Sequence, residues 1–136
     1  MKKTETQQAI LRAAKKLFIT NGYKGTTTAQ IAREAGVSEM TLFRHFPSKD
    51  DIFRAVIHPL VSYLHNLDVN GQNDMRKTVR DLMENQLRFL IEERDLVRLV
   101  VIESFLAERN ENPIADVMAR VEKLFSAFEP YQRELL

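Results

Sequence analysis

Two short helical segments separated by a single glycine occupy residues 27–46, TTAQIAREAGVSEMTLFRHF, and they constrain the fold more than any other feature. Thr27 and Gln30 have the spacing of a capping box, in which each side chain accepts a backbone N–H from the other residue. Gly36 ends the first segment, because glycine tolerates a positive φ. Ser38 is a favourable cap for the second segment. A helix, a tight turn and a second helix in this order form a helix-turn-helix.

The second of these helices has an apolar side and a polar side. We expect Ile31, Val37, Leu42 and Phe46 to be interior, which turns the opposite side of the helix outward. The outward residues are Glu39, Met40, Thr41, Phe43, Arg44 and His45. A short helix that is anchored on one side and projects such residues on the other suits insertion into the major groove of DNA. A purely structural helix-turn-helix is the alternative.

Helical periodicity continues along the rest of the chain without strand alternation, so the sequence predicts an all-α fold. The further predicted helices cover about residues 5–21, 49–66, 74–93, 95–108 and 113–129. The segment 95–108, DLVRLVVIESFLAE, is apolar around most of its circumference, and we therefore expect it to be buried.

The balance of charge differs between the two parts of the chain. Residues 1–60 contain ten Lys or Arg and five Asp or Glu, whereas residues 61–136 contain ten basic and fourteen acidic residues. Such an asymmetry can indicate a polyanion-binding lobe joined to a lobe with another role, although uneven solvation of two helical surfaces gives the same count. The polar stretch 68–74, DVNGQND, contains an Asn-Gly turn signal and is the expected boundary between the lobes.

Several classes of protein are excluded by what the chain lacks. It has no cysteine, which excludes disulfides, thiolate metal sites and cysteine nucleophiles. Its histidines, His45, His58 and His65, form no metal-binding or catalytic motif, and there is no glycine-rich phosphate loop. We therefore expect no enzymatic activity, no cofactor and no metal. No apolar run is long enough for a signal peptide or a membrane span, so we expect no membrane partner and a cytoplasmic location.

The stretch GYKGTTTAQIAREAGVSEMTLFRHFPSKDDIFRAVI, residues 22–57, resembles the DNA-binding region of the tetracycline-repressor (TetR) family of bacterial transcription regulators. The resemblance begins at AILRAAKKLF in the first helix and rests on TT, IA, AGVS, TLF, HF and SK at the family's intervals. It implies a three-helix DNA-binding lobe followed by a helical effector and dimerisation lobe, which is truncated here because the family's final two helices are missing. The implied domains are a helix-turn-helix domain over 1–48, a connecting helix over 49–68 and an incomplete effector-binding domain over 69–136.

The resemblance also implies a function. It points to a sequence-specific DNA-binding transcriptional regulator, more often a repressor than an activator, which a small-molecule effector releases from a palindromic operator. Family members bind as homodimers, and whether this shorter chain dimerises is left open by its sequence. The alternative is a helical ligand-binding or protein-binding module that no longer binds DNA.

The family's DNA-binding roles carry over to individual positions. Thr27 matches a helix cap that touches phosphate, and His45 and Lys49 match positions near the DNA backbone, with Lys49 as the firmest phosphate contact. Phe43 departs from the family's usual tyrosine, which removes one hydroxyl contact to phosphate. The residues that fall on the recognition helix are Ser38, Glu39, Met40, Thr41 and Arg44. Among these, Arg44 could bond a guanine through two N–H groups, and Met40 could contact a thymine methyl group.

An effector pocket among the central helices is a further implication of the resemblance. Its candidate lining residues are Tyr63, His65, Phe89, Phe105, Met118 and Phe125. Methionine and aromatic residues at helical spacing are also ordinary core residues, and this second interpretation stays open.

Overall fold

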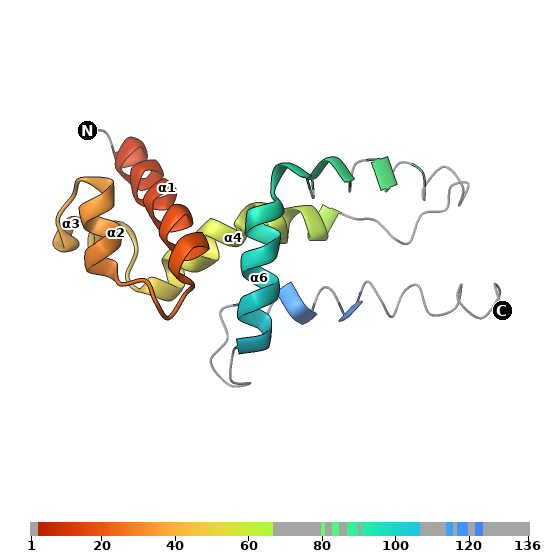
Figure 1. Ribbon diagram of the computed structural model, residues 1–136. Helices are drawn as coiled ribbons and strands as arrows, with labels where there is room; N and C mark the ends of the chain where they lie inside the picture. The colour runs from red at the N-terminus through yellow and green to blue at the C-terminus, as the bar shows by residue number, and fades with distance from the viewer. Residues whose placement is uncertain are drawn as a thin grey trace.

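The computed structural model describes residues 3–66 and 91–106, together with parts of 80–89 and 114–123. All regular structure in these parts is helical, which confirms the predicted all-α fold. The labelled helices are α1 (Lys3–Asn21), α2 (Thr28–Ala35), α3 (Glu39–His45), α4 (Lys49–Asn66) and α6 (Arg94–Leu106) (Figure 1). None of the helices in the described ranges is long and apolar enough to cross a membrane.

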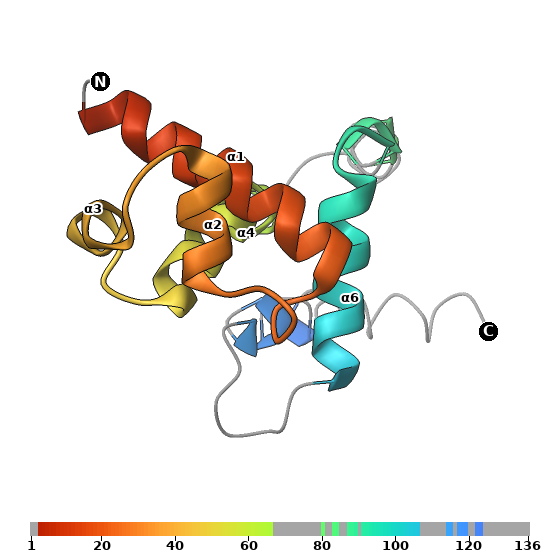
Figure 2. The same ribbon diagram turned by 60° about the vertical axis from the view of Figure 1, so that its left-hand side comes forward.

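Helices α1, α2 and α3 form a small bundle at one end of the molecule (Figure 1). The buried face of α1 consists of Ile10, Ala13, Ala14 and Phe18, at the helical spacing that the sequence predicts. The alanines allow close packing of α2, whose Ile31 is fully buried against the same core. Figure 2 shows α3 at the outer edge of the bundle, on the side away from α6.

The start of α2 and the turn between α2 and α3 have the geometry that their residues favour. Thr27 Oγ1 accepts the N–H of Gln30 at 3.2 Å, and Gln30 Oε1 accepts the N–H of Thr27 at 2.9 Å, so the predicted capping box is present. Gly36 has φ 72°, in the left-handed region that glycine adopts at low cost. Ser38 Oγ then accepts the N–H of Thr41 at 3.1 Å and caps α3. The predicted helix-turn-helix is confirmed.

Helix α4 leads from this bundle toward the second half of the chain (Figure 1). Ser48 caps it by accepting the N–H of Asp51 at 3.2 Å. Ile52, Phe53 and Ile57 are almost fully buried, and the ring of Phe53 meets that of Phe18 edge to face at 5.1 Å. Burial on this scale contributes about 1.5–3 kcal/mol for each large apolar side chain, which fixes α4 firmly to α1.

Helix α6 crosses the far side of α1 and α4 (Figure 2). The expectation that this helix is buried all round is wrong. Leu96, Leu99, Val100 and Glu103 are buried and Val97 is half-buried. Four other apolar residues are 44–85% exposed: Val101, Ile102, Phe105 and Leu106. The reason is geometric: within the described part of the chain, α1 and α4 pack against one side of α6 and leave the other side open.

Candidate nucleic-acid interface

The outer face of α3 (Met40, Phe43 and Arg44) is exposed, and its inner face is buried. Met40 is 68% exposed and Phe43 is 44% exposed, while Leu42 is completely buried and Phe46 is 8% exposed. The side chain of Arg44 also lies at the surface. The sequence-based expectation of which side faces inward is therefore confirmed for Leu42 and Phe46. Three residues are half-buried instead: Val37, which was expected to be interior, and Thr41 and His45, which were expected to face outward. A helix of seven residues is not stable alone, so this inner face is what holds the outer face in a fixed direction.

Polar contacts orient the side chains at the start of α3. Ser38 Oγ donates to Thr41 Oγ1 at 3.0 Å, and Thr28 Oγ1 of α2 donates to Glu39 Oε2 at 2.9 Å. Thr41 is half-buried as a result of its position beside the cap. The bond between Thr28 and Glu39 joins the N-terminal ends of α2 and α3.

Arg44 makes no ion pair within the described part of the chain. Its guanidinium contacts the sulfur of Met40 at 3.8 Å, and no carboxylate of the described residues lies within ion-pair distance of it. A free guanidinium presents five N–H donors in a planar fork, which matches two acceptors on one base edge or on one phosphate. Thr27 is also exposed, and His45 is half-buried with its Nδ1 unpaired among the described residues.

Lys49 has an internal role that the sequence did not reveal. Its Nζ donates to the carbonyl oxygens of Tyr23 at 3.0 Å and Thr26 at 3.1 Å, and it lies 4.2 Å from the centre of the Tyr23 ring. Burial lowers the pKa of Lys49, and the negative charge of Glu103 opposes that shift. One N–H of the ammonium group is left for another acceptor. The phosphate contact predicted for Lys49 stays a prediction.

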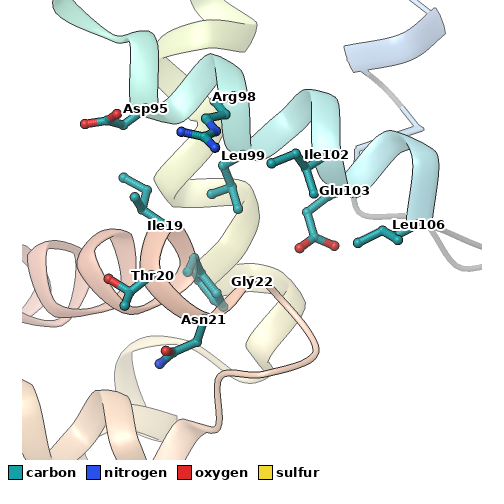
Figure 3. Close-up of a pocket in the computed structure, with 11 residues that line it drawn as sticks. Ile19, Thr20, Asn21, Gly22, Asp95, Arg98, Leu99, Ile102, Glu103 and Leu106 are labelled. Carbon is teal, nitrogen blue, oxygen red and sulfur yellow. The ribbon is translucent and has the colours of Figure 1, made fainter.

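Glu103 of α6 is a second group that sequence reasoning missed. Its side chain points toward the end of α1, where Gly22 lies (Figure 3). Its carboxylate accepts the backbone N–H of Tyr23 at 2.8 Å. Burial raises the pKa of this carboxyl group, and the nearby charges of Lys24 and Lys49 lower it. The available signal was one acidic residue within the mostly apolar run LVVIESFL.

A hollow of about 420 Å³ lies between the end of α1 and α6, next to Glu103 (Figure 3). Apolar residues such as Phe18, Leu99 and Leu106 line it together with Arg98. Of the residues predicted to line an effector pocket, those whose side chains the structure describes do not belong to it; these are Tyr63, Phe89, Phe105 and Met118.

The predicted effector residues are only partly brought together. The rings of Tyr63 and Phe89 stack with their centres 4.1 Å apart and an angle of 2° between their planes. The Tyr63 hydroxyl is buried without a partner among the described residues, and burial raises its pKa. Phe105 is 85% exposed and Met118 is 39% exposed, so neither extends this pair into an enclosed pocket. The side chain of His65 and all of Phe125 lie outside the described residues.

Comparisons with known proteins agree with this geometry. A family model described as bacterial regulatory proteins, tetR family, matches residues 10–56, which include the whole helix-turn-helix. The nucleoid occlusion factor SlmA of Vibrio campbellii is 32% identical over 139 residues that cover 99% of this chain and 68% of that protein. SlmA of Photobacterium profundum is 30% identical with the same coverage. Among solved structures, the hemolysin II transcriptional regulator HlyIIR has a TM-score of 0.75 at 23% identity, covering 98% of this chain and 76% of its own, which shows a shared fold.

Proposed function

Because this chain belongs to the TetR family of bacterial regulatory proteins, we propose that it regulates transcription by inserting α3 into the major groove of a palindromic operator. The observation that carries the proposal is the orientation of α3, with Leu42 and Phe46 in the core and Met40 and Arg44 at the surface. This arrangement leaves the outer face of α3 available to a partner, and its residue types suit base edges.

The proposed contacts divide into those that read bases and those that hold phosphates. Arg44 bonds O6 and N7 of a guanine, and Met40 contacts a thymine methyl group. Glu39 accepts from the amino group of a cytosine or repels misplaced phosphates. Thr27, at the start of α2, and the remaining N–H of Lys49 bind phosphate oxygens, which positions the helix without reading sequence.

The proposed regulator acts as a homodimer whose two α3 helices lie about one turn of DNA apart. A small-molecule effector in the C-terminal lobe changes that spacing and releases the operator, which makes the protein a repressor. Tyr63 and Phe89 are the described residues that support such a site, because they form a half-buried aromatic surface with an unpaired hydroxyl. The effector must bind one spacing more tightly than the other, since equal affinity would shift nothing.

The proposal is tested by measuring binding to the DNA that flanks the gene of this protein. Fluorescence anisotropy with a labelled duplex from that region and with a random duplex of equal length, both at the same stated salt concentration, gives a specificity ratio. Specific regulators bind their sites about 10³–10⁷ times more tightly than random DNA. Equal affinity for the flanking DNA, for sites found by genome-wide binding and for the random duplex would refute the proposal and favour a ligand-binding or protein-binding module.

A further inference from the structure

The turn between α1 and α2 (residues 22–27, called the α1–α2 turn below) is contacted by two further helices, α4 and α6. Lys49 at the start of α4 donates to the carbonyl oxygens of Tyr23 and Thr26. Glu103 of α6 accepts the N–H of Tyr23 from the opposite direction. Asp50 of α4 also accepts a hydrogen bond from the Tyr23 hydroxyl. One residue of the turn, Tyr23, is therefore bonded to α4 and to α6 at once.

The turn is itself rigidly connected to the DNA-binding helices. The hydroxyl of Thr26, which is completely buried, donates to the carbonyl oxygens of Leu17 at 3.1 Å and Gly22 at 2.8 Å. Thr27, the next residue, caps α2. The Tyr23 ring packs between Phe18 of α1 and Phe53 of α4, with centres 5.8 and 5.1 Å away. A displacement of this turn therefore moves the starts of α2 and α4 together.

Burial of the Glu103 carboxylate costs free energy, and the proposed DNA contacts give this residue no role. Only 9% of its surface is exposed, and a buried carboxylate is costly unless hydrogen bonds and positive charge compensate it. The compensation comes from the DNA-binding half: the Tyr23 N–H and the charges of Lys24 and Lys49. Gly22 permits the close approach, because a Cβ there would lie 3.2 Å from the Glu103 oxygen.

We propose that Glu103 is the positioning residue through which α6 controls the DNA-binding state of α3 and α4. This inference rests on the proposed function and assigns the residue that carries its regulation. With Glu103 in place, the α1–α2 turn is held and α4 starts from a fixed point. A shift of α6 by about 1 Å breaks a 2.8 Å hydrogen bond, which leaves the Tyr23 N–H unpaired and Lys49 without its nearby negative charge. The turn and the start of α4 then relax together, and the outer face of α3 loses its operator-binding placement.

A second contact between the same parts of the chain supplies a matched control. Lys15 of α1 forms an ion pair with Glu93, immediately before α6, at 2.9 Å, and both side chains are partly exposed at 42% and 27%. This pair joins α6 to α1 without touching the α1–α2 turn. Glu93→Gln therefore removes a negative charge from the junction and leaves the proposed connection intact.

The experiment uses the full chain with the substitutions Glu103→Leu, Glu103→Gln, Glu93→Gln and Lys49→Met, and with Lys49→Met combined with each Glu103 substitution. Glu103→Leu removes both the acceptor and the charge, and the apolar hollow beside it, lined by Leu99 and Leu106, accommodates the new side chain. Glu103→Gln keeps an acceptor for the Tyr23 N–H and is the conservative rescue. The first readout is amide hydrogen exchange at Tyr23, measured by NMR, with Phe18 as the internal reference. The second is operator affinity by fluorescence anisotropy.

We expect Glu103→Leu to accelerate exchange at Tyr23 at least about tenfold relative to Phe18, because the N–H loses its buried acceptor. Its operator affinity should fall at least about fivefold, with Glu103→Gln restoring most of the exchange protection and Glu93→Gln matching the unmodified protein in both readouts. The losses from Glu103→Leu and Lys49→Met should combine to less than their product, since both act on one turn.

Three results would overturn the inference. These are operator affinity for Glu103→Leu equal to that of the unmodified protein, unchanged exchange at Tyr23, or fully multiplicative losses in the double variant. A failure of the proposed function is distinguishable from these, because the unmodified protein would then bind operator and random DNA equally. A Glu103→Leu protein that does not fold would shift the decision to Glu103→Gln. Glu103→Gln must keep the exchange protection of the Tyr23 N–H. Its loss of operator affinity must also combine with that of Lys49→Met to the full product of the two losses. Any other result contradicts the proposal.

Discussion

Replacement of Arg44 separates base reading from phosphate binding, because two substitutions remove different properties of the same side chain. Arg44→Ala removes the charge and the planar fork, whereas Arg44→Lys keeps the charge and removes the fork. A bidentate contact to guanine is worth about 1–3 kcal/mol of discrimination, which is about a 5- to 150-fold ratio of dissociation constants. In a dimer on a palindromic operator the two half-sites add, so changing the guanine in both gives about 2–6 kcal/mol.

Neither substitution of Arg44 is expected to affect folding. Arg44 is exposed, and its guanidinium contacts the Met40 sulfur at 3.8 Å at the surface, so neither substitution removes buried packing. We expect the free energy of unfolding to change by less than about 0.5 kcal/mol, as is usual for surface positions. Urea denaturation of the three proteins checks this before any DNA is added.

The assay is fluorescence anisotropy with the operator and with duplexes that carry each of the three other base pairs at the guanine position, over a series of salt concentrations. Arg44→Ala should bind the four duplexes almost equally, whereas Arg44→Lys, whose ammonium group can still donate to guanine, should keep part of the discrimination. Arg44→Lys should keep the salt dependence of the unmodified protein, because the number of phosphate charges it neutralises is unchanged. If Arg44→Ala retains full discrimination, or weakens operator and random DNA by the same factor, Arg44 contacts phosphate and the base-reading assignment is wrong.

Three other predictions follow from the contacts of the DNA-binding half. Lys49→Met should lower the free energy of unfolding by about 2 kcal/mol, because it removes two charge-assisted hydrogen bonds to the α1–α2 turn. If Lys49 of each protomer also contacts a phosphate, the salt slope of the dimer falls by about two, and an unchanged slope would assign Lys49 to the turn alone. Ser38→Ala should cost about 1 kcal/mol in urea denaturation through loss of the α3 cap, and a change below about 0.3 kcal/mol would contradict that role. Burial raises the pKa of Glu103, so its protonated form favours the folded state. Compared with Glu103→Gln, the unmodified protein should have its largest stability advantage below the ordinary pKa of glutamate and should lose it as the pH rises through the raised pKa of the folded state. Parallel urea denaturations of the two proteins between about pH 4 and 8 check the sign.

The helix-turn-helix was predictable because its signals are local. The capping box of Thr27 and Gln30, the left-handed glycine at Gly36 and the cap at Ser38 each depend on residues within four positions of one another. The inward direction of Leu42 follows from helical spacing alone. For the same reason helical spacing predicts which face of α3 is buried and which face is exposed.

The roles of Lys49 and Glu103 could not be predicted in this way. The hydrogen bond from Tyr23 to Glu103 joins residues 80 positions apart, and the one from Lys49 to Tyr23 spans 26 positions. No periodic pattern reports such pairs. The prediction that α6 is buried failed for a related reason. The composition of this helix specifies how much apolar surface it has and not which neighbours cover that surface.

The shortness of α3 explains why the DNA-binding half needs such long-range contacts. Seven residues make at most a few internal hydrogen bonds, and an isolated helix of this length is unstable in water. Its direction is therefore set by what lies behind it: Leu42 in the core, the α2 cap and the start of α4 that follows it. Lys49 fixes that start to the α1–α2 turn, and Glu103 fixes the same turn to α6. The residues that read a base and the residues that decide whether the base can be reached are thus different sets, and only the first set lies on the surface that meets DNA.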